Sequence, residues 1–301
     1  MAHVHRGPSP LEEGFPIALS DRRYYSARTG KDPKKLSLDL TLLRRLFYST
    51  YVSFVDKNYF QEALGYECVD LGQVSGSMGS DPELYVALRL REEGLFPIRP
   101  DIEYSEDNIF DLLEFFYDHI SKPIDGPYHS YNNCGYHYNT FDKAAGQDDF
   151  RTEVNKFLRD YGDGWELSPN GEMLSVGQPG LHHLFDAKVP SDDTYNITSR
   201  IAAAISKFRR HRSSVEDRND AVRDLAAVLE YLRPEAHRLL TKKDESDLFD
   251  LANRFGIRHH NEKQQTDYDH DIWLSWVFYY YLSTIHALLR IIERNSAAGT
   301  K

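Results

Sequence analysis

The stretch from residue 252 to residue 273, ANRFGIRHHNEKQQTDYDHDIW, gathers side chains that can act on an anion or a proton near neutral pH. It holds two arginines and two adjacent histidines beside a glycine: Arg254, Arg258, His259 and His260. Histidine titrates near neutrality, and arginine presents a planar set of donors that suits a phosphate or a carboxylate. The pattern is compatible with an anion site, a metal site, an acid–base pair or a solvated helix end.

A second group of ligand-type residues occurs in the segment YHSYNNCGYHY. It contains His129, Cys134 and His137, and no fourth ligand stands at a recognisable spacing from them. The other cysteine, Cys68, lies far from Cys134 and no CxxC pair is present, which argues against a Cys-rich zinc module and against a disulfide framework. We therefore expect no metal site and no cofactor.

Acidic residues cluster directly ahead of the last apolar run of the chain. The cluster consists of Asp267, Asp269, His270 and Asp271. Because aspartate is favoured at helix N-caps, we expect these residues to begin the last helix, with metal binding as the lesser alternative.

Composition indicates a globular chain. Its 301 residues are 41% hydrophobic and 13% aromatic, which is enough to bury a core in one large or two ordinary domains. The net charge of −11 argues against a basic surface that coats nucleic acid. The N-terminal residues lack the apolar core of a signal peptide. Polar residues interrupt the apolar run over 272–292, which favours a buried helix over a membrane span. We expect a cytoplasmic protein without a membrane partner.

Three sections of the chain differ in composition and in the spacing of their apolar residues. Residues 1–36 are rich in proline and glycine and predict a loosely ordered extension. Residues 37–190 predict a mainly helical domain with a small β-hairpin. The expected elements are one or two helices over 38–65 closed by Gly65, helices over 81–94, 105–123 and 148–164, a loop or short strands over 125–147, and a hairpin over 164–176.

The third section, residues 191–301, predicts four helices. They are expected over 193–214, 214–234, 242–256 and about 271–294, with Pro234 ending the second. The predicted architecture is a four-helix bundle with one polar corner between its third and fourth helices. The fold class is therefore mainly α.

That corner resembles the motif of HEPN domains, helical proteins whose ribonucleases carry an arginine followed by a histidine after four to six residues. Arg254 precedes His259 with four residues between and His260 with five, and it is the one arginine in the chain that satisfies this spacing. The corner also stands just before the last helix, as in the family. The helix DRNDAVRDLAAVLEYLR is similar to the one that precedes the motif in bacterial HEPN proteins.

The first domain resembles the N-terminal region of abortive-infection proteins of the J type. The likeness lies in the segments KNYFQEALG, DLLEFFYDHISKP and FRTEVNKFLRDYGDGWELSPNGEML. Members of that family join a helical N-terminal domain with a small hairpin to a C-terminal HEPN domain. The resemblance implies a toxin-like ribonuclease in phage defence or a related stress response, with RNA and not DNA as its partner.

The resemblance also implies site roles. RNA supplies its own nucleophile in the 2′-OH, so cleavage needs a proton-transfer group and a fixed cation but no metal. His259 or His260 would transfer protons, and Arg254 would bind the phosphate. Arg258 and Lys263 would make secondary contacts.

A basic segment, KFRRHRSS, lies near the start of the bundle. Its arginines, Arg209, Arg210 and Arg212, are expected either to guide an RNA backbone or to form a solvated face.

Two features bear on activity and assembly. Phe255 follows Arg254 where catalytically competent members often have Asn, Asp or His, and this favours the alternative of an inactive HEPN module that binds nucleotide, RNA or a protein. HEPN ribonucleases act as dimers that bring two motifs into one cleft. The aromatic run over 273–281 is expected either to supply a homodimer interface or to face the core alone.

Overall fold

The computed structural model describes Tyr25, Thr29 and the ranges 38–178, 180–254 and 269–299. Contacts divide the chain into one unit of residues Met1–Ser37 and a second of Leu38–Lys301. Most of the predicted extension lies outside the described residues. The second unit is mainly helical, which confirms the predicted mainly α class.

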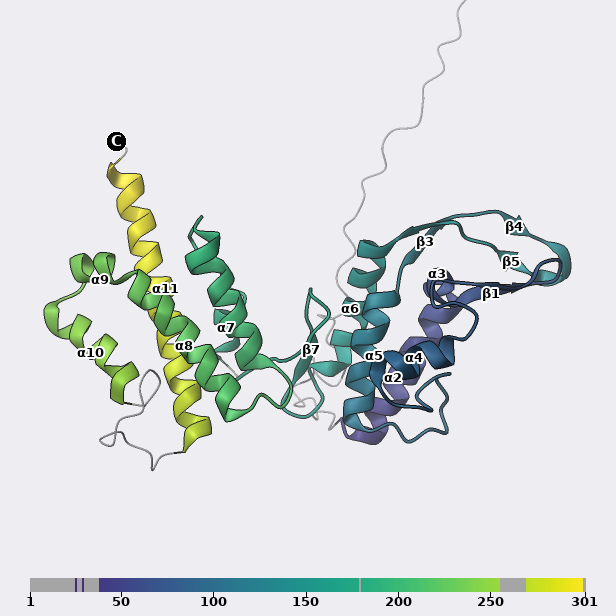
Figure 1. The fold of residues 1–301 in the computed structure, drawn as a ribbon, viewed down its shortest axis with the longest axis horizontal. Coiled ribbons are helices and arrows are strands. Elements are labelled where there is room, and N and C mark those ends of the chain that lie inside the picture. The colour runs from purple at the N-terminus through teal and green to yellow at the C-terminus, as the bar shows by residue number, and fades with distance from the viewer. Residues whose placement is uncertain (1–24, 26–28, 30–37, 179, 255–268, 300–301) are drawn as a thin grey trace, which may run out of the picture. The chain divides into compact units, whose positions relative to one another are not determined.

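Three helices form the first part of the second unit (Figure 1). They are α2 (Leu40–Asp56), α5 (Glu106–His119) and α6 (Lys143–Leu158). The amphipathic pattern of each helix turns aromatic side chains inward, and the rings of Phe47 and Phe116 stack with centroids 6.2 Å apart. The helices predicted over 38–65, 105–123 and 148–164 are thus confirmed, with α6 beginning five residues earlier than expected.

Two shorter helices follow the capping signals of the sequence. Helix α3 (Gln61–Leu64) ends at Gly65, whose φ of +81° suits the glycine expected there. Helix α4 (Pro82–Leu90) begins after Asp81, whose carboxylate accepts a hydrogen bond from the first turn. It ends at Leu90, followed by Arg91 in the left-handed region, four residues before the predicted stop at residue 94.

Four two-stranded antiparallel sheets occur within the described ranges. They pair β1 (Gly65–Cys68) with β2 (Gly72–Ser75), β3 (Lys122–Asp125) with β6 (Thr140–Asp142), β4 (Tyr128–His129) with β5 (Gly135–Tyr136), and β7 (Trp165–Leu167) with β8 (Met173–Ser175). The predicted β7–β8 hairpin is confirmed. The short strands expected as one alternative over 125–147 are present as β3 to β6, beginning at Lys122. The β1–β2 hairpin was not predicted, because strands of four residues are too short to show a clear alternating pattern.

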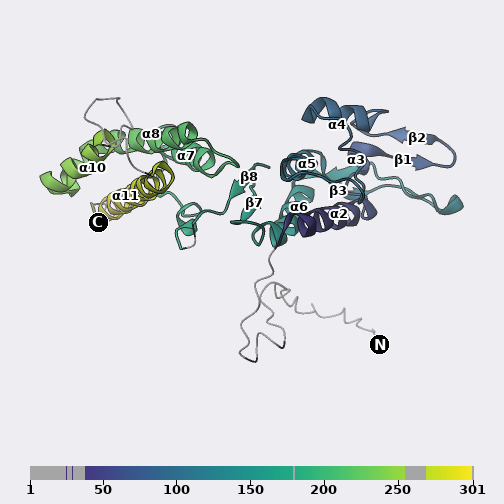
Figure 2. The ribbon, with the colours of Figure 1, turned by 90° about the horizontal axis from the view of Figure 1, so that it is seen from below.

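Helices fill the last part of the chain. In order they are the π-helix η4 (Thr194–Thr198), α7 (Ser199–Arg209), α8 (Val215–Tyr231), α9 (Arg233–Leu239), α10 (Lys242–Arg254) and α11 (His270–Gly299). Helix α8 lies against both α7 and α11 (Figure 2). Helix α9 was not predicted: Pro234 ends α8 as expected but then occupies the first turn of α9, where proline is tolerated.

The buried apolar residues form two clusters, one over 38–173 and the other over 197–289. They fall on either side of the predicted domain boundary at 190/191. Leu184, Phe185 and Val189 nevertheless pack against the second cluster, because the chain reaches the bundle before its first helix begins.

Helix α11 supplies much of the second cluster. Over Ile272–Ser296 it is, within the described ranges, the one helix long and apolar enough to cross a membrane, yet 56% of the apolar 18-residue window within that span is buried in the fold. Phe278, Leu282 and Ile285 are almost fully buried. The helix thus has the burial of a core helix, as the sequence predicted.

One polar side chain lies inside this apolar core. His286 is 6% exposed, and neither ring nitrogen has a hydrogen-bond partner among the described residues. Burial, with a smaller effect from Arg290, lowers the pKa of His286 below its ordinary value of 6.5. Below pH 6.5 the unfolded chain therefore binds a proton at this histidine more readily than the folded chain does. The free energy of unfolding falls as the pH drops below 6.5, and His286 does not affect it at a pH well above that value.

We expect His286→Leu to weaken this pH dependence and to raise the free energy of unfolding at about pH 7.5 by about 1–3 kcal/mol, because an unsatisfied buried polar group is removed. Urea unfolding at a series of pH values measures both effects. His183→Leu, at an exposed position, is the control. Equal losses of stability on acidification in wild type and His286→Leu would contradict the assignment.

Candidate functional site

The polar corner predicted from the sequence lies between two helices. Helix α10 ends at Arg254 and helix α11 begins at His270, so the motif stands directly ahead of the last helix. The structure describes the helical backbone of Arg254 but not its side chain. The remaining predicted members lie outside the described residues: Arg258, His259, His260 and Lys263.

Asp269 begins the last helix. Its Oδ1 accepts a hydrogen bond from the backbone N–H of Ile272 at 3.1 Å, and its carbonyl accepts one from Trp273. The capping role predicted for this acidic cluster is thus confirmed at Asp269.

Arg209 has a structural position. Its side chain is 7% exposed, and its guanidinium donates to the carbonyl of Ser175 at 2.7 Å and to the Glu166 carboxylate at 2.6 Å. The same group lies over the ring of Phe185, 4.7 Å from its centroid. Because its donors face protein atoms, Arg209 holds α7 against the β7–β8 hairpin. The prediction that Arg209 contacts RNA is therefore withdrawn.

Arg210 and Arg212 are different from their neighbour. Their side chains are 56% and 68% exposed. Arg210 lies 3.6 Å from Glu172, and Arg212 donates to Asp107 at 2.7 Å. Exposed pairs of this kind contribute little to stability, so both guanidinium groups can exchange these carboxylates for a phosphate.

One face of α11 leaves apolar side chains in solvent. Ile272, Trp276 and Tyr280 follow one another at four-residue intervals and are 63%, 45% and 38% exposed. The rings of Trp276 and Tyr280 stack with centroids 5.6 Å apart. These three residues, the aromatic face of α11, border a hollow of about 380 Å³ that Leu181 and Leu184 also line.

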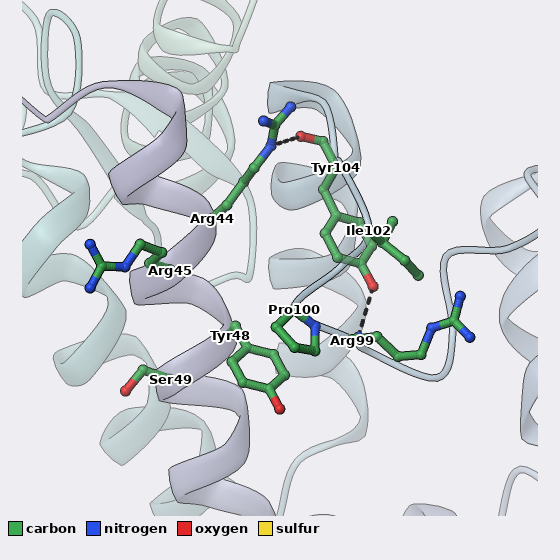
Figure 3. Close-up of a pocket in the computed structure, with 8 residues that line it drawn as sticks. All are labelled: Arg44, Arg45, Tyr48, Ser49, Arg99, Pro100, Ile102 and Tyr104. Carbon is green, nitrogen blue, oxygen red and sulfur yellow. Dashed lines mark hydrogen bonds between the residues drawn. The ribbon is translucent and has the colours of Figure 1, made fainter.

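A pocket of about 350 Å³ beside α2 is rich in arginine (Figure 3). The guanidinium of Arg44 donates to the carbonyl of Tyr104 at 2.6 Å, and that of Arg99 lies 3.7 Å from Asp101. Figure 3 shows Arg44, Arg45 and Arg99 pointing in three different directions. The three cations therefore do not converge on one anion.

A second pocket, of about 370 Å³, is lined by acidic residues of α5 and by His119. Burial raises the pKa values of Asp111 and Glu114 and lowers that of His119. Perturbed groups in a pocket suggest acid–base chemistry. Here, however, two of these groups already have partners within the protein. Glu114 accepts a hydrogen bond from the backbone N–H of Met173 at 2.6 Å, and His119 Nε2 lies 3.2 Å from the Tyr85 hydroxyl. This pocket was not predicted from the sequence, where its one signal was the i, i+3 spacing of Asp111 and Glu114.

Four potential metal ligands meet at the tips of two hairpins. They are Cys68, His129, Cys134 and His137, and the ligand atoms all lie within 4.8 Å of one another. The sequence offered His129, Cys134 and His137 no fourth ligand at a recognisable spacing, and folding brings Cys68 beside them. A separation of about sixty residues in the chain left no spacing signal for Cys68.

Comparison of the chain with protein-family models, with curated proteins and with solved structures finds no match. The likeness to HEPN domains and to abortive-infection proteins of the J type stays a prediction. So do the roles given to Arg254, His259 and His260.

The contrast between two nearby arginines is testable. We expect Arg209→Ala to lower the free energy of unfolding by on the order of 3 kcal/mol, because it leaves the mostly buried Glu166 carboxylate without its close cation. Arg212→Ala should cost less than about 1 kcal/mol, because its pair is exposed. Urea denaturation of the two variants measures the difference. Similar small losses in both would show that Arg209 does not hold the hairpin.

Proposed function

We propose that this protein is a metal-independent endoribonuclease of the HEPN type that acts in phage defence or a related stress response. The observation that carries the proposal is the place of the Arg–His motif. Arg254 ends α10, and both histidines fall in the connection to α11, the last helix. That order of elements agrees with the resemblance to HEPN ribonucleases.

The packing of the helices supports the same proposal. Helix α8 packs against α7 and α11. It holds most of the segment DRNDAVRDLAAVLEYLR, which is similar to the helix that precedes the motif in bacterial HEPN proteins. Its buried residues Val222, Leu225 and Leu229 belong to the same cluster as the inner face of α11. Helix α11, which follows the motif in the chain, is therefore fixed on a packed core, and catalytic groups require such support.

The chemistry needs two kinds of group. One histidine accepts the proton of the RNA 2′-OH as its oxygen attacks the adjacent phosphorus, and a histidine donates a proton to the departing 5′-oxygen. The new 2′-O–P bond and the broken P–O5′ bond leave a 2′,3′-cyclic phosphate and a 5′-hydroxyl. Arg254 stabilises the negative charge that grows on the phosphate oxygens. His259 and His260 are the candidates for proton transfer, and none of these steps calls for a metal.

Basic residues near the bundle would position the RNA. Arg258 and Lys263 stand in the motif segment, and Arg210 and Arg212 are exposed at the end of α7. In a chain with a net charge of −11, binding of a polyanion depends on such local groups.

A homodimer would complete the site. The aromatic face of α11 exposes Ile272, Trp276 and Tyr280 on the helix that follows the motif. Contiguous exposed aromatic side chains are typical of protein interfaces. We propose that two copies pair through this face, which would bring two motifs into one cleft.

Substitutions in the motif test the ribonuclease proposal. His259→Ala is expected to reduce cleavage by about a hundredfold or more with little change in RNA affinity, because proton transfer acts only in the transition state. Arg254→Ala should lower both, because a phosphate ligand acts in both states. His260→Ala should be the milder change if the four-residue spacing is the working one. Single-turnover cleavage and filter binding of one labelled RNA measure these effects.

The alternative is an inactive HEPN module, which Phe255 favours. In that case wild type leaves single-stranded and structured RNA intact, while Arg254→Ala and His259→Ala both weaken binding.

If the protein is instead the proposed metal-independent ribonuclease, cleavage by wild type should persist in EDTA. Cleavage that EDTA abolishes and Mg²⁺ or Mn²⁺ restores would contradict the metal-independent mechanism.

The dimer has its own test. Trp276→Glu should shift the protein from dimer to monomer at micromolar concentration, because it places a charge in the apolar interface. Light scattering coupled to gel filtration measures the mass. Tyr195→Glu, at a residue 79% exposed in η4, should leave the dimer intact. A wild-type protein that is monomeric at micromolar concentration would contradict the proposal.

A further inference from the structure

We propose that Cys68, His129, Cys134 and His137 bind one zinc ion in a closed, four-coordinate structural site. This site lies in the first part of the unit, away in sequence from the Arg–His motif, and does not depend on the proposed ribonuclease activity. It would join the tips of the β1–β2 and β4–β5 hairpins (Figure 1).

The distances between the ligand atoms suit a tetrahedral ion. Cys68 Sγ lies 3.7 Å from His129 Nδ1, and Cys134 Sγ lies 3.1 Å from His137 Nε2. Bonds of about 2.3 Å to sulfur and about 2.0–2.1 Å to nitrogen in a tetrahedron place such atoms about 3.6 Å apart. All the ligand atoms lie within 4.8 Å of one another, so shifts of up to about 1 Å in these separations would admit the ion.

Backbone structure brings the four ligands together. Cys68 ends β1 and His129 ends β4, while Cys134 stands just before β5 and His137 just after it. Gly135, between the second cysteine and the rest of β5, has a φ of +94°, which a glycine adopts without strain. The turn can therefore point Cys134 and His137 at one centre.

The strand that carries His137 is held from both sides. Gln61, a buried side chain of α3, accepts from the N–H of Tyr138 at 2.6 Å and donates to the carbonyl of Tyr136 at 3.0 Å. On the other side, a Cβ at Gly126 would come within 2.3 Å of the His137 carbonyl oxygen. This close backbone approach sets the position of His137 before any ion binds.

A carboxylate orients one of the histidines. His129 Nε2 lies 3.2 Å from Asp70 Oδ2, while its other nitrogen, Nδ1, faces Cys68. Metal-binding histidines commonly donate their second N–H to a carboxylate, which fixes the tautomer and raises the basicity of the ligand atom. The ring of His137 is positioned differently, by stacking on Tyr66 at 4.2 Å.

The hairpins need such an ion because they have little core of their own. In the described residues between Ile120 and Phe150, none belongs to the first buried apolar cluster. Tyr128, Tyr131 and Tyr136 are 58%, 68% and 49% exposed. Two-residue strands without a buried face are marginal in water, and small modules of this kind are commonly held by a metal.

The chemistry of the ligands selects the metal. Two thiolates and two imidazoles suit zinc, whereas Mg²⁺ and Ca²⁺ prefer oxygen ligands. Two thiolates also cancel the charge of a divalent ion, which favours a site whose Cys68 is only 3% exposed. All four positions would be filled by protein, so the ion holds structure and carries no reaction.

Metal analysis of the full-length protein tests the proposal. After removal of any histidine tag, under reducing conditions, mass spectrometry should find about one zinc per chain. Cys134→Ser and His129→Ala should lose most of it, and His183→Ala, at an exposed histidine outside the cluster, should keep it. Wild type that takes up no zinc from an excess, or full occupancy in Cys134→Ser and His129→Ala, would overturn the proposal.

Cobalt binding to the wild-type protein tests the proposal even if Cys134→Ser and His129→Ala fail to fold. Co²⁺ bound to wild type should give the strong visible bands of a tetrahedral ion and a thiolate-to-cobalt charge-transfer band. Asp70→Asn should weaken metal affinity by about 10–100-fold with the same spectrum, whereas Asp101→Asn, at another exposed aspartate, should not. A cobalt spectrum without the thiolate band, or a Cys68–Cys134 disulfide found by thiol counting in the purified protein, would overturn the site. Each readout is independent of RNA cleavage, so the two proposals can fail separately.

Discussion

The burial of α11 is the constraint on which the last part of the fold depends. This helix carries apolar residues on nearly every side, and one bundle can cover only some of them. Phe278, Leu282 and Ile285 are buried with α8, which sets how the two helices pack. The same packing positions α11, the helix that follows the polar corner in the sequence. The remaining aromatic face stays in solvent because the described helices of one chain do not cover it.

A second constraint joins the bundle to the hairpin before it. The guanidinium of Arg209 is largely removed from water and is stable there because Glu166 and a backbone carbonyl replace its hydration. Ser206 adds a hydrogen bond to Glu172 at 2.7 Å on the same side of α7. Polar contacts thus connect the two apolar clusters, which agrees with their assignment to one contact unit.

The hairpin tips are held in a different way from the helices. The helices are stabilised by buried aromatic and aliphatic side chains, whereas the β1–β2 and β4–β5 hairpins place most of their large side chains in solvent. What they share is a group of ligand atoms gathered around Cys68. A metal-linked tip has little need of hydrophobic burial, since coordination bonds replace the missing core. The proposed zinc ion would account for the exposed tyrosines of these hairpins.

Local features were read correctly from the sequence, because they depend on residues a few positions apart. The glycine that ends α3, the N-cap of α11 at Asp269 and the β7–β8 hairpin each record an interaction within a few residues. The order of helices, with Arg254 just before the last one, followed from the same signals. The β1–β2 hairpin was missed, because strands of four residues are too short to show a clear period.

Only the tertiary structure decided which distant residues meet. Cys68 and His129 are sixty-one residues apart and become neighbours because two hairpins lie side by side. Arg209 and Arg212 share one basic segment, yet one is buried and the other is exposed, because the β7–β8 hairpin covers only the first. Sequence patterns report contacts along the chain. Contacts between elements depend on how every apolar face is buried at once, and that is a property of the whole fold.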